Sequence, residues 1–257
     1  MIGILFTARL GSSRLHQKHL IDTCGRTMIE WLIYRFESKF KEELKNLSVK
    51  LVLATSTNSE NKEFIKVLKD YNVEVFQGDD KNIPLRYNEC AKKYNFEYVI
   101  IVDGDDILVS TNAAKIIYNE IKLNTTFQII QTEGLPLGLN LSAYKSSYLN
   151  KSLEHSKNLN LEIGWTRIFE NPSIKKIELG KYKLQSDYRF TLDYEDDAIF
   201  FKNIICYYKE QILDVSDEEI LKFVDANNLT MINKHLSEQY WDNYFKSVNK
   251  AINNEWQ

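Results

Sequence analysis

Apolar β-like runs alternate with helix-like segments through the first half of the chain, and this alternation limits the fold more than any other feature. Two runs, Leu51–Ala54 and Val99–Val102, are continuously apolar, as strands buried on both faces of a parallel sheet are. The pattern favours an α/β fold with a mainly parallel sheet and helices on both faces. We expect strands at residues 2–6, 50–54, 73–76 and 98–102, and helices at residues 28–40, 61–70, 85–94 and 112–122.

The pattern changes after residue 126. Shorter and more polar pieces between residues 127 and 192 predict an inserted β-hairpin layer, a common place for a second substrate or a subunit contact. Helices are expected after Asp193, and the last of them is amphipathic, which suits either a core or a dimer contact. The expected strands are residues 127–131, 138–144 and 174–178, and the expected helices are residues 147–157, 196–210, 217–227 and 234–253.

Composition and charge exclude several classes of protein. The 257 residues include 33 Lys and Arg against 36 Asp and Glu, so we expect no nucleic-acid partner, and any anionic ligand must be held by local basic groups. No apolar run approaches the roughly 18 residues of a membrane span, which predicts a cytoplasmic protein without a membrane partner. Cys24, Cys90 and Cys206 are widely spaced, which fits neither a disulfide framework nor a zinc site and favours a reducing compartment.

The loop after the first predicted strand, residues 7–18, gathers three cations among small residues. Arg9, Arg14 and Lys18 could neutralise an oxyanion while backbone N–H groups converge on it. The small residues between these cations are Gly11, Ser12 and Ser13. Their spacing matches neither a Walker P-loop nor the dinucleotide fingerprint. The cluster therefore suits a triphosphate, with a solvated basic turn as the alternative.

Carboxylates gather at the ends of two later strand-like runs. Asp103, Asp105 and Asp106 follow the fourth predicted strand, and hard oxygen ligands at a strand end suit Mg²⁺. The alternative is an acidic turn that caps the next helix. The other run, residues 189–193, ends in Asp193, which could supply a second metal ligand.

Three weaker signals lie outside these clusters. Thr55 and Ser56 end the second strand with hydroxyls that could contact a base edge, although such a run is also a routine turn or helix cap. Arg86 opens a predicted helix and is either a phosphate or base contact or a surface charge. The histidines have no ligand spacing and are expected not to bind metal. They are His16, His19, His155 and His235.

Taken in order, these motifs resemble those of the cytidylyltransferase family that includes CMP-ketodeoxyoctonate synthetase, and more closely its spore-coat-polysaccharide type. The resemblance covers roughly residues 1–225, and its specificity lies in the joint order of the motifs. They are Ala8-Arg-Leu-Gly-Ser-Ser-Arg-Leu-x-x-Lys18, Ala54-Thr-Ser56, Phe76-Gln-Gly-Asp79, Leu85-Arg-Tyr87, Val102-x-Gly-Asp105 and Thr191-Leu-Asp193. The resemblance implies a nucleotidyltransferase (Rossmann-like) fold with a mixed, mainly parallel sheet, and a homodimer.

The resemblance also implies an activity. CMP would pass from CTP to an acidic sugar or a phosphate or phosphonate acceptor with release of pyrophosphate, in the synthesis of surface-polysaccharide or glycoconjugate precursors. Asp105 and Asp193 would bind Mg²⁺, with Mn²⁺ as the alternative. Catalysis would come from an in-line geometry and from charge neutralisation by Arg9, Arg14 and Lys18. The nucleotide-binding residues would be Thr7, Ala8, Arg9, Gly11, Ser12, Ser13, Arg14, Lys18, Thr55, Ser56, Arg86 and Asp103.

The chain pattern and the resemblance together give a domain organisation. Residues 1–257 are expected to form a single nucleotidyltransferase domain. Its parts would be a nucleotide-binding half at residues 1–126, an acceptor or dimerisation insertion at residues 127–192, and a metal-ligand strand end with C-terminal helices at residues 193–257.

Three departures from the family pattern bear on the acceptor. Relatives usually read Arg-Leu-Pro-Gly-Lys in the first loop, whereas His16-Gln17 follows Leu15 here, so the loop should be less rigid or touch a different group. A Gly-Leu-Asp element appears as Gly138-Leu-Asn140, and a Glu-His-x-Thr element appears as Glu162-Ile-Gly-Trp-Thr166. These changes suggest an unusual acceptor, either a nonulosonic or other keto-acid sugar or a phosphate or phosphonate.

Two other functions compete with this interpretation. Asp103-Gly-Asp105 is an Asp-x-Asp element, which a metal-dependent glycosyltransferase would use with a nucleotide sugar, although such an enzyme has less need of a three-cation loop. The chain could also be a non-catalytic nucleotide-binding module. The joint presence of Lys18, Asp105 and Asp193 argues against that module.

Overall fold

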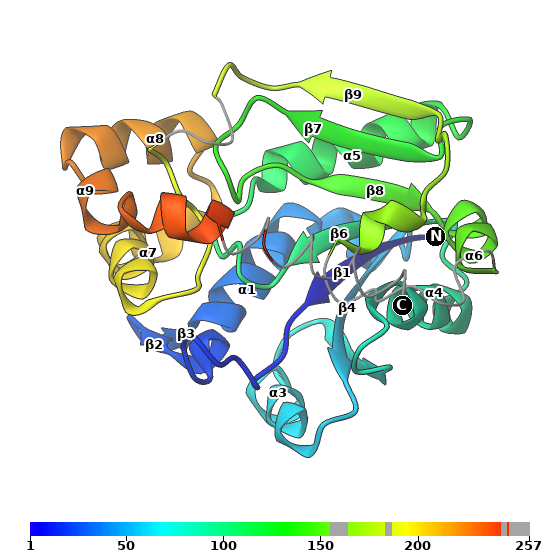
Figure 1. Cartoon of the computed structure of the whole chain (residues 1–257), viewed down its shortest axis with the longest axis horizontal. Helices are drawn as coiled ribbons and strands as arrows, with labels where there is room; N and C mark the ends of the chain where they lie inside the picture. The colour runs from blue at the N-terminus through cyan, green and yellow to red at the C-terminus, as the bar shows by residue number, and fades with distance from the viewer. Residues whose placement is uncertain (155–163, 183–186, 243–245, 247–257) are drawn as a thin grey trace.

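A seven-stranded sheet runs through the computed structural model, which describes residues 1–154, 164–182, 187–242 and 246 (Figure 1). Its strand order is β5-β4-β1-β6-β8-β7-β9. The first four of these strands are parallel, β8 runs antiparallel to both of its neighbours, and β9 is parallel to β7. The strands are β1 (Ile2–Thr7), β4 (Val49–Ser56), β5 (Val73–Gly78), β6 (Tyr98–Asp103), β7 (Ile129–Glu133), β8 (Ser142–Lys145) and β9 (Ile174–Glu178). The predicted mainly parallel α/β fold is confirmed.

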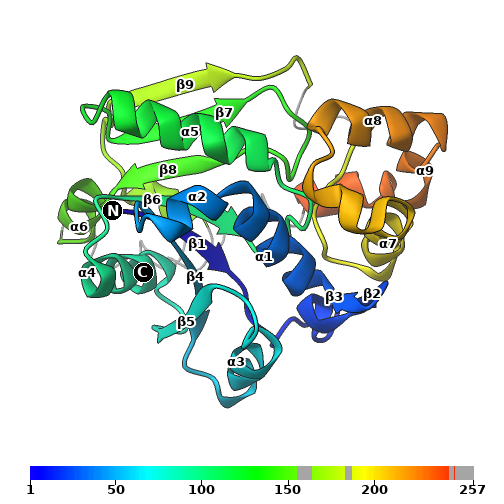
Figure 2. The same cartoon turned by 180° about the vertical axis from the view of Figure 1, so that it is seen from behind.

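Helices cover both faces of this sheet, because successive strand residues point to opposite sides. Ile4 and Phe6 belong to the buried cluster that holds α1 and α5, whereas Leu5 belongs to the cluster of α4 and α6. A third group, α7 to α9, lies beside one end of the sheet (Figures 1 and 2). The α-helices are α1 (Met28–Lys39), α2 (Lys41–Lys45), α3 (Glu63–Val67), α4 (Ile83–Tyr94), α5 (Thr111–Leu123), α6 (Ser146–Glu154), α7 (Glu195–Tyr208), α8 (Asp217–Ala226) and α9 (Thr230–Asn233).

Short elements connect these layers. Two antiparallel pieces, β2 (Asp22–Thr23) and β3 (Arg26–Thr27), form a small separate sheet before α1. The 3₁₀ turns are η1 (Lys18–Leu20), η2 (Ser59–Lys62), η3 (Trp165–Ile168) and η4 (Lys209–Leu213). Among the described residues, no helix is both long enough and apolar enough to cross a bilayer.

Side-chain caps explain where several helices begin. Thr27 and Glu30 form a capping box at the start of α1, and Ser216 and Glu219 form the same motif at the start of α8. The Ser110 hydroxyl accepts the Ala113 N–H at 2.9 Å at the start of α5. Each cap satisfies a backbone donor that a helix terminus would otherwise leave without a partner.

The inserted hairpin of β7 and β8 is present, but it is not a separate layer. Strand β8 pairs directly with β6, with Ala143 opposite Ile100, so the insertion continues the central sheet. The strand predicted at residues 138–144 begins only at Ser142. Its first residues form a turn in which Gly138 has a φ of 87°, and a Cβ there would lie 2.1 Å from the Phe190 carbonyl oxygen.

One prediction about the last quarter of the chain is wrong: residues 189–193 are not a strand, because their ladder is limited to one isolated bridge between Leu137 and Arg189. The helix predicted at residues 234–253 is confirmed where the chain is described, since residues 236–242 are helical after the turn that follows α9. Most of the remainder of that prediction lies outside the described residues.

The cysteines also correct an expectation. Cys24 and Cys206 form a disulfide with their Cα atoms 5.6 Å apart, although 182 positions separate them in the chain. Sequence spacing could not reveal this pair, because the fold brings the β2–β3 turn against α7. The inference of a reducing compartment therefore loses its basis. Cys90 is buried, and desolvation raises the pKa of its thiol to about 12.

Candidate active site

The ends of β1 and β6 form the floor of the site. Thr7 pairs with Asp103 in the parallel register, and its hydroxyl donates to Asp103 Oδ1 at 3.1 Å. The Gly104 N–H then donates to the Thr7 carbonyl at 2.8 Å. A Cβ at Gly104 would lie 2.6 Å from that carbonyl oxygen, so glycine is required for this approach. The turn places the carboxylates that follow β6 at the carboxyl edge of the sheet, where open α/β folds bind ligands.

Two adjoining cavities open above this edge. The loop cleft, of about 560 Å³, lies between the first loop and the carboxylates. The insertion cavity, of about 580 Å³, lies against β7 and β8 and includes Asp106, whose pKa is raised by desolvation and by the neighbouring carboxylates. The two cavities share Asp103, Trp165 and Thr166. A molecule in one cavity would therefore meet a molecule in the other at these residues.

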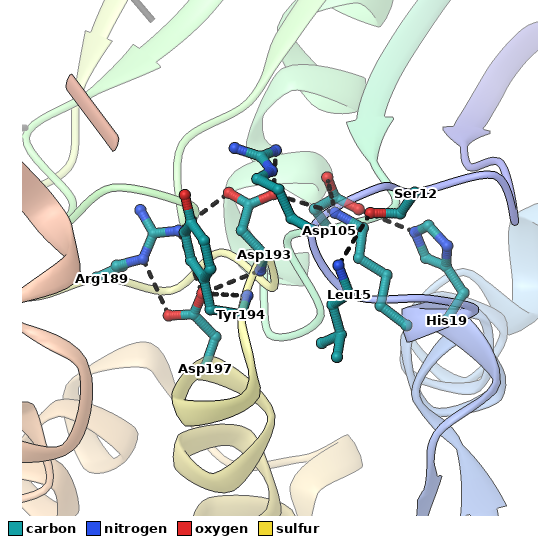
Figure 3. A network of polar contacts seen from close by, with 10 residues as sticks. Ser12, Leu15, His19, Asp105, Arg189, Asp193, Tyr194 and Asp197 are labelled. Carbon is teal, nitrogen blue, oxygen red and sulfur yellow. Dashed lines mark hydrogen bonds and ion pairs between the residues drawn. The ribbon is translucent and has the colours of Figure 1, made fainter. Parts of the chain in front are cut away.

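Lys18, which lines the loop cleft, joins the two predicted metal ligands. Its ammonium lies 2.7 Å from Asp105 Oδ2 and 3.1 Å from Asp193 Oδ1. Arg14 Nη2 contacts the same Asp193 oxygen at 2.5 Å, and His19 Nε2 lies 2.9 Å from Asp105 Oδ1. Figure 3 shows this network, with His19 and Asp105 on one side and Asp193 on the other. The fold thus brings together the first loop, the end of β6 and the start of α7.

A buried network fixes Asp193 from behind. Arg189 donates through Nη2 to Asp193 Oδ2 at 3.0 Å and through Nε to Asp197 Oδ1 at 2.9 Å, and its side chain is fully buried. Asp197 Oδ2 also accepts the N–H groups of Asp193 and Tyr194 at 2.9 and 3.0 Å. Asn233 Nδ2 donates to Asp197 Oδ1 at 2.9 Å. The Asp193 carboxylate therefore has little freedom to rotate.

Burial and charge act in opposite directions on the protonation of this site. Desolvation lowers the pKa of Lys18, but the charges of Asp105 and Asp193 outweigh it and leave that pKa raised. Desolvation raises the pKa of Asp105, but Lys18 and His19 more than reverse this and leave that pKa well below its usual range. For Asp103, desolvation by the surrounding protein and the Asp105 charge both raise the pKa. Lys18 and Asp105 are therefore a charged pair at neutral pH.

Most predicted nucleotide contacts line the loop cleft. They are Thr7, Ala8, Arg9, Gly11, Ser12, Ser13, Arg14, Lys18, Arg86 and Asp103. Arg86 is buried, and it donates to the carbonyls of Asp79 and Asp80 at 2.8 and 3.0 Å, so it is not the surface charge of the alternative interpretation. It holds the loop after β5 while it lines the cleft.

Thr55 and Ser56 do not belong to that lining. Both side chains are fully buried, and Ser56 Oγ accepts from Asn61 Nδ2 at 2.8 Å. Asn61 Oδ1 in turn accepts the Leu10 N–H at 2.9 Å. Ser56 and Asn61 thus hold the first loop in place, and we no longer expect the buried Thr55 and Ser56 hydroxyls to contact a base.

Two departures from the family motifs can be located. Asn140 Nδ2 donates to the Leu135 carbonyl at 2.7 Å and its Oδ1 accepts the Leu135 N–H at 3.3 Å, so it closes the turn before β8. An aspartate could not donate to that carbonyl. Glu162 lies outside the described residues, whereas Trp165 and Thr166 stand on the wall between the two cavities.

Sequence reasoning missed two residues of the site. His19 was expected to be unrelated to metal chemistry, yet it contacts Asp105, 86 positions away. Asp197 was not among the predicted site residues, yet it pairs with Arg189. The available signals were the place of His19 directly after Lys18 and the spacing of Asp193 and Asp197, which lie four positions apart at the start of α7.

The donor set of the loop cleft fits a divalent cation. Asp105 and Asp193 both reach the Lys18 ammonium, and carboxylate oxygens are ligands that Mg²⁺ prefers, with water and substrate phosphates completing its shell. Within the described residues, no three His, Cys, Asp or Glu side chains gather as a preformed metal site. A cation held by the two aspartates would therefore draw its other ligands from water or substrate and would compete with Lys18.

A cation-rich loop that faces paired carboxylates at the carboxyl edge of this sheet is the arrangement of a nucleotidyltransferase. A family model described as Cytidylyltransferase matches residues 3–211, a segment that includes the first loop, Asp105 and Asp193. The chain therefore belongs to the cytidylyltransferase family, enzymes that transfer CMP from CTP. This membership decides against the glycosyltransferase and against the non-catalytic module.

Similar proteins support the fold. An uncharacterized protein of Methanocaldococcus jannaschii is 25% identical over 233 residues, which are 88% of this chain and 91% of that protein. A cytidylyltransferase structure from Leptospira borgpetersenii has a TM-score of 0.73 at 20% identity and covers 90% of this chain and 97% of its own. CMP:2-keto-3-deoxy-manno-octonic acid synthetase complexed with CTP has a TM-score of 0.55 at 14% identity, covering 80% of this chain and 98% of its own.

Proposed function

We propose that this enzyme transfers CMP from CTP to an acidic sugar or to a phosphate or phosphonate acceptor, in the synthesis of a surface-polysaccharide or glycoconjugate precursor. The observation that carries the proposal is the wall of Asp103, Trp165 and Thr166 shared by the two cavities. A nucleotide in the loop cleft and an acceptor in the insertion cavity would meet there. Holding two reactants in contact supplies much of the rate acceleration in phosphoryl transfer.

The first loop receives the triphosphate in this proposal. Arg9, Arg14 and Lys18 line the loop cleft together with Gly11, Ser12 and Ser13. An oxygen of the acceptor attacks the α-phosphorus in line and forms the new P–O bond, while the bond to pyrophosphate breaks. The three cations neutralise the charge that develops on the departing pyrophosphate.

Arg14 and Lys18 must exchange partners to do this. Both contact Asp193, and Lys18 also contacts Asp105. Asp105 and Asp193 are the residues that would hold Mg²⁺ or Mn²⁺, which supplies further neutralisation of the triphosphate when bound. The aspartates thus keep the cations of the loop in place until a nucleotide arrives.

The insertion cavity suits a hydroxylated acceptor. Its volume falls within the roughly 300–1,000 Å³ of small-molecule sites. It is lined by amide, hydroxyl and aromatic groups that include Gln131, Ser142, Tyr144 and Tyr182, and also by the carboxyl groups of Asp103, Asp106 and Glu133. Tyr144 and Trp165 lie edge to face with ring centroids 5.1 Å apart, which makes a firm aromatic wall beside the shared residues.

A pyrophosphate-release assay tests the proposed function. CTP, UTP, GTP and ATP are each offered with Mg²⁺ and a panel of keto-acid sugars, sugar phosphates and phosphonates. We expect release that requires both CTP and one acceptor class. Release of a nucleoside diphosphate from a sugar nucleotide, with no pyrophosphate from any triphosphate, would contradict the proposal.

We also propose that the enzyme works as a homodimer in the cytoplasm. Each chain would form one domain, in which residues 127–192 contact both the acceptor and the other subunit. The support for the contact is that β9 ends the strand order of the sheet and that, within the described residues, β7 is its only strand partner. Light scattering after size-exclusion chromatography measures the mass, and a mass of one chain at micromolar concentration would contradict the dimer.

A further inference from the structure

Two consecutive residues of the first loop hold the two oxygens of Asp105 separately. Lys18 Nζ lies 2.7 Å from Oδ2, and His19 Nε2 lies 2.9 Å from Oδ1. Both loop residues belong to η1, whose Leu20 N–H donates to the Gln17 carbonyl at 2.8 Å. The carboxylate is therefore clamped from one short turn, and the labelled His19 ring points at it in Figure 3.

The surroundings of His19 define what it can do. Its side chain is 2% exposed, and its ring lies edge to face with Phe64 at 6.0 Å between centroids. A carboxylate only accepts hydrogen bonds, so the contact requires the proton on Nε2. Nδ1 is buried and has no partner among the described residues. His19 is therefore set to donate one hydrogen bond to Asp105.

Lys18 and His19 differ in what each does when substrate binds. In the proposed function, Lys18 moves from the carboxylates to the triphosphate, which frees Asp105 Oδ2. His19 is a core side chain packed against Phe64, and it keeps its hold on Oδ1. Metal-ligating carboxylates are commonly oriented by hydrogen bonds of this kind.

We propose that His19 is a positioning residue that keeps Asp105 facing the loop cleft while Oδ2 exchanges the Lys18 ammonium for a divalent cation. This inference rests on the proposed function. It assigns to His19 a hydrogen bond and no direct contact with the cation. It also explains why a histidine is buried beside the loop although the spacing of the histidines in the sequence does not indicate a metal ligand.

The test uses three variants of the full chain. His19→Phe keeps a ring and removes the donor, and His19→Gln places an amide N–H near the position of Nε2. Phe64→Leu is the packing control, because it alters the neighbour of His19 and leaves the donor intact. Mn²⁺ affinity is measured by water-proton relaxation in the presence of a non-hydrolysable CTP analogue, and kcat and KM for CTP are measured by pyrophosphate release.

We expect His19→Phe to weaken Mn²⁺ binding by about 10- to 100-fold and to lower kcat, with KM for CTP nearly unchanged. His19→Gln should recover most of both losses, and Phe64→Leu should bind Mn²⁺ like the wild type. Unchanged Mn²⁺ affinity in His19→Phe, or a His19→Gln variant no better than His19→Phe, would overturn the inference.

A double variant separates positioning from direct ligation. In an Asp105→Asn background, adding His19→Phe should change Mn²⁺ affinity no further, because the residue acts through Asp105. A further loss would mean that His19 contacts the cation itself and would overturn the inference. A wild-type enzyme that neither binds Mn²⁺ with the analogue nor releases pyrophosphate would overturn the proposed function as well.

Discussion

The two carboxylates that contact Lys18 are supported in different ways. The Asp193 side chain is 2% exposed and belongs to a buried network with Arg189 and Asp197. The Asp105 side chain is 33% exposed and is held by Lys18 and His19 from a short turn. Asp193 is therefore fixed by the interior of the protein, whereas the position of Asp105 depends on a loop. We expect the exchange of partners during substrate binding to occur at Asp105, on the loop side.

The largest expected effect comes from disrupting the buried network that fixes Asp193. Asp197→Ala removes the acceptor of five hydrogen bonds and leaves buried Arg189 with Asp193 alone. Breaking a buried pair on one side costs roughly 3–5 kcal/mol, so the urea midpoint should fall steeply. Asp196→Ala is the matched control, because its contact with His235 at 3.4 Å lies on the surface. Equal falls of the urea midpoint in the two variants would contradict the role of Asp197 in fixing Asp193.

The next effect concerns catalysis on the loop side. Lys18→Ala should lower kcat/KM for CTP by about 10³-fold, since removal of one well-placed donor to a developing charge commonly costs 10²–10³. Its circular dichroism spectrum should match that of the wild type. Lys62→Ala, at an exposed position outside the cleft, serves as the control. Turnover in Lys18→Ala within a few-fold of the wild type would remove this residue from the mechanism.

A smaller effect compares the two aspartates directly. Asp193→Asn should cost about 2–4 kcal/mol of unfolding free energy, because buried Arg189 loses part of its counter-charge. Asp105→Asn should cost less than about 1 kcal/mol, since a partly exposed ion pair contributes little. Both variants should lose turnover. Urea unfolding measures the difference, and equal losses of unfolding free energy would show that the two carboxylates are supported equally.

The smallest effect lies in the loop itself. Gln17 has a φ of 48° and a ψ of 33°, the left-handed conformation that glycine adopts freely. Side chains there cost roughly 1–2 kcal/mol, while glycine loses about 0.5–1 in unfolded-state entropy. Gln17→Gly should therefore raise stability slightly, by about 0.5 kcal/mol, in thermal unfolding. A clear loss of stability would mean that the Gln17 side chain supports the loop.

The sequence predicts the first half of the fold well because its strands are buried on both faces. Residues 98–102 predict β6 to within one position, and residues 50–54 lie within β4, whose residues are almost all buried. Residues 189–193 mislead because alternation resembles a strand even where the chain makes one isolated bridge. That segment is shaped by the turn at Gly138, a contact between distant parts of the chain that local pattern cannot supply.

The site is predicted in the same uneven way. Lys18, Asp105 and Asp193 come from separate motifs, and the fold brings them into contact. Thr55 and Ser56 end a strand at the same edge, yet both side chains are buried, and Ser56 Oγ accepts a hydrogen bond from Asn61 Nδ2. Position after a strand tells which edge of the sheet a residue reaches, but burial decides whether its side chain faces a ligand.

The most direct test of the account is thermal unfolding of the wild-type protein with Mg²⁺ and each of CTP, UTP, GTP, ATP and a set of sugar nucleotides. A ligand at about 100 times its dissociation constant adds roughly 2.7 kcal/mol of stability. The account predicts that CTP stabilises the protein selectively and that the effect of CTP is largely lost in Lys18→Ala. Stabilisation by sugar nucleotides alone, or no response to CTP, would contradict it.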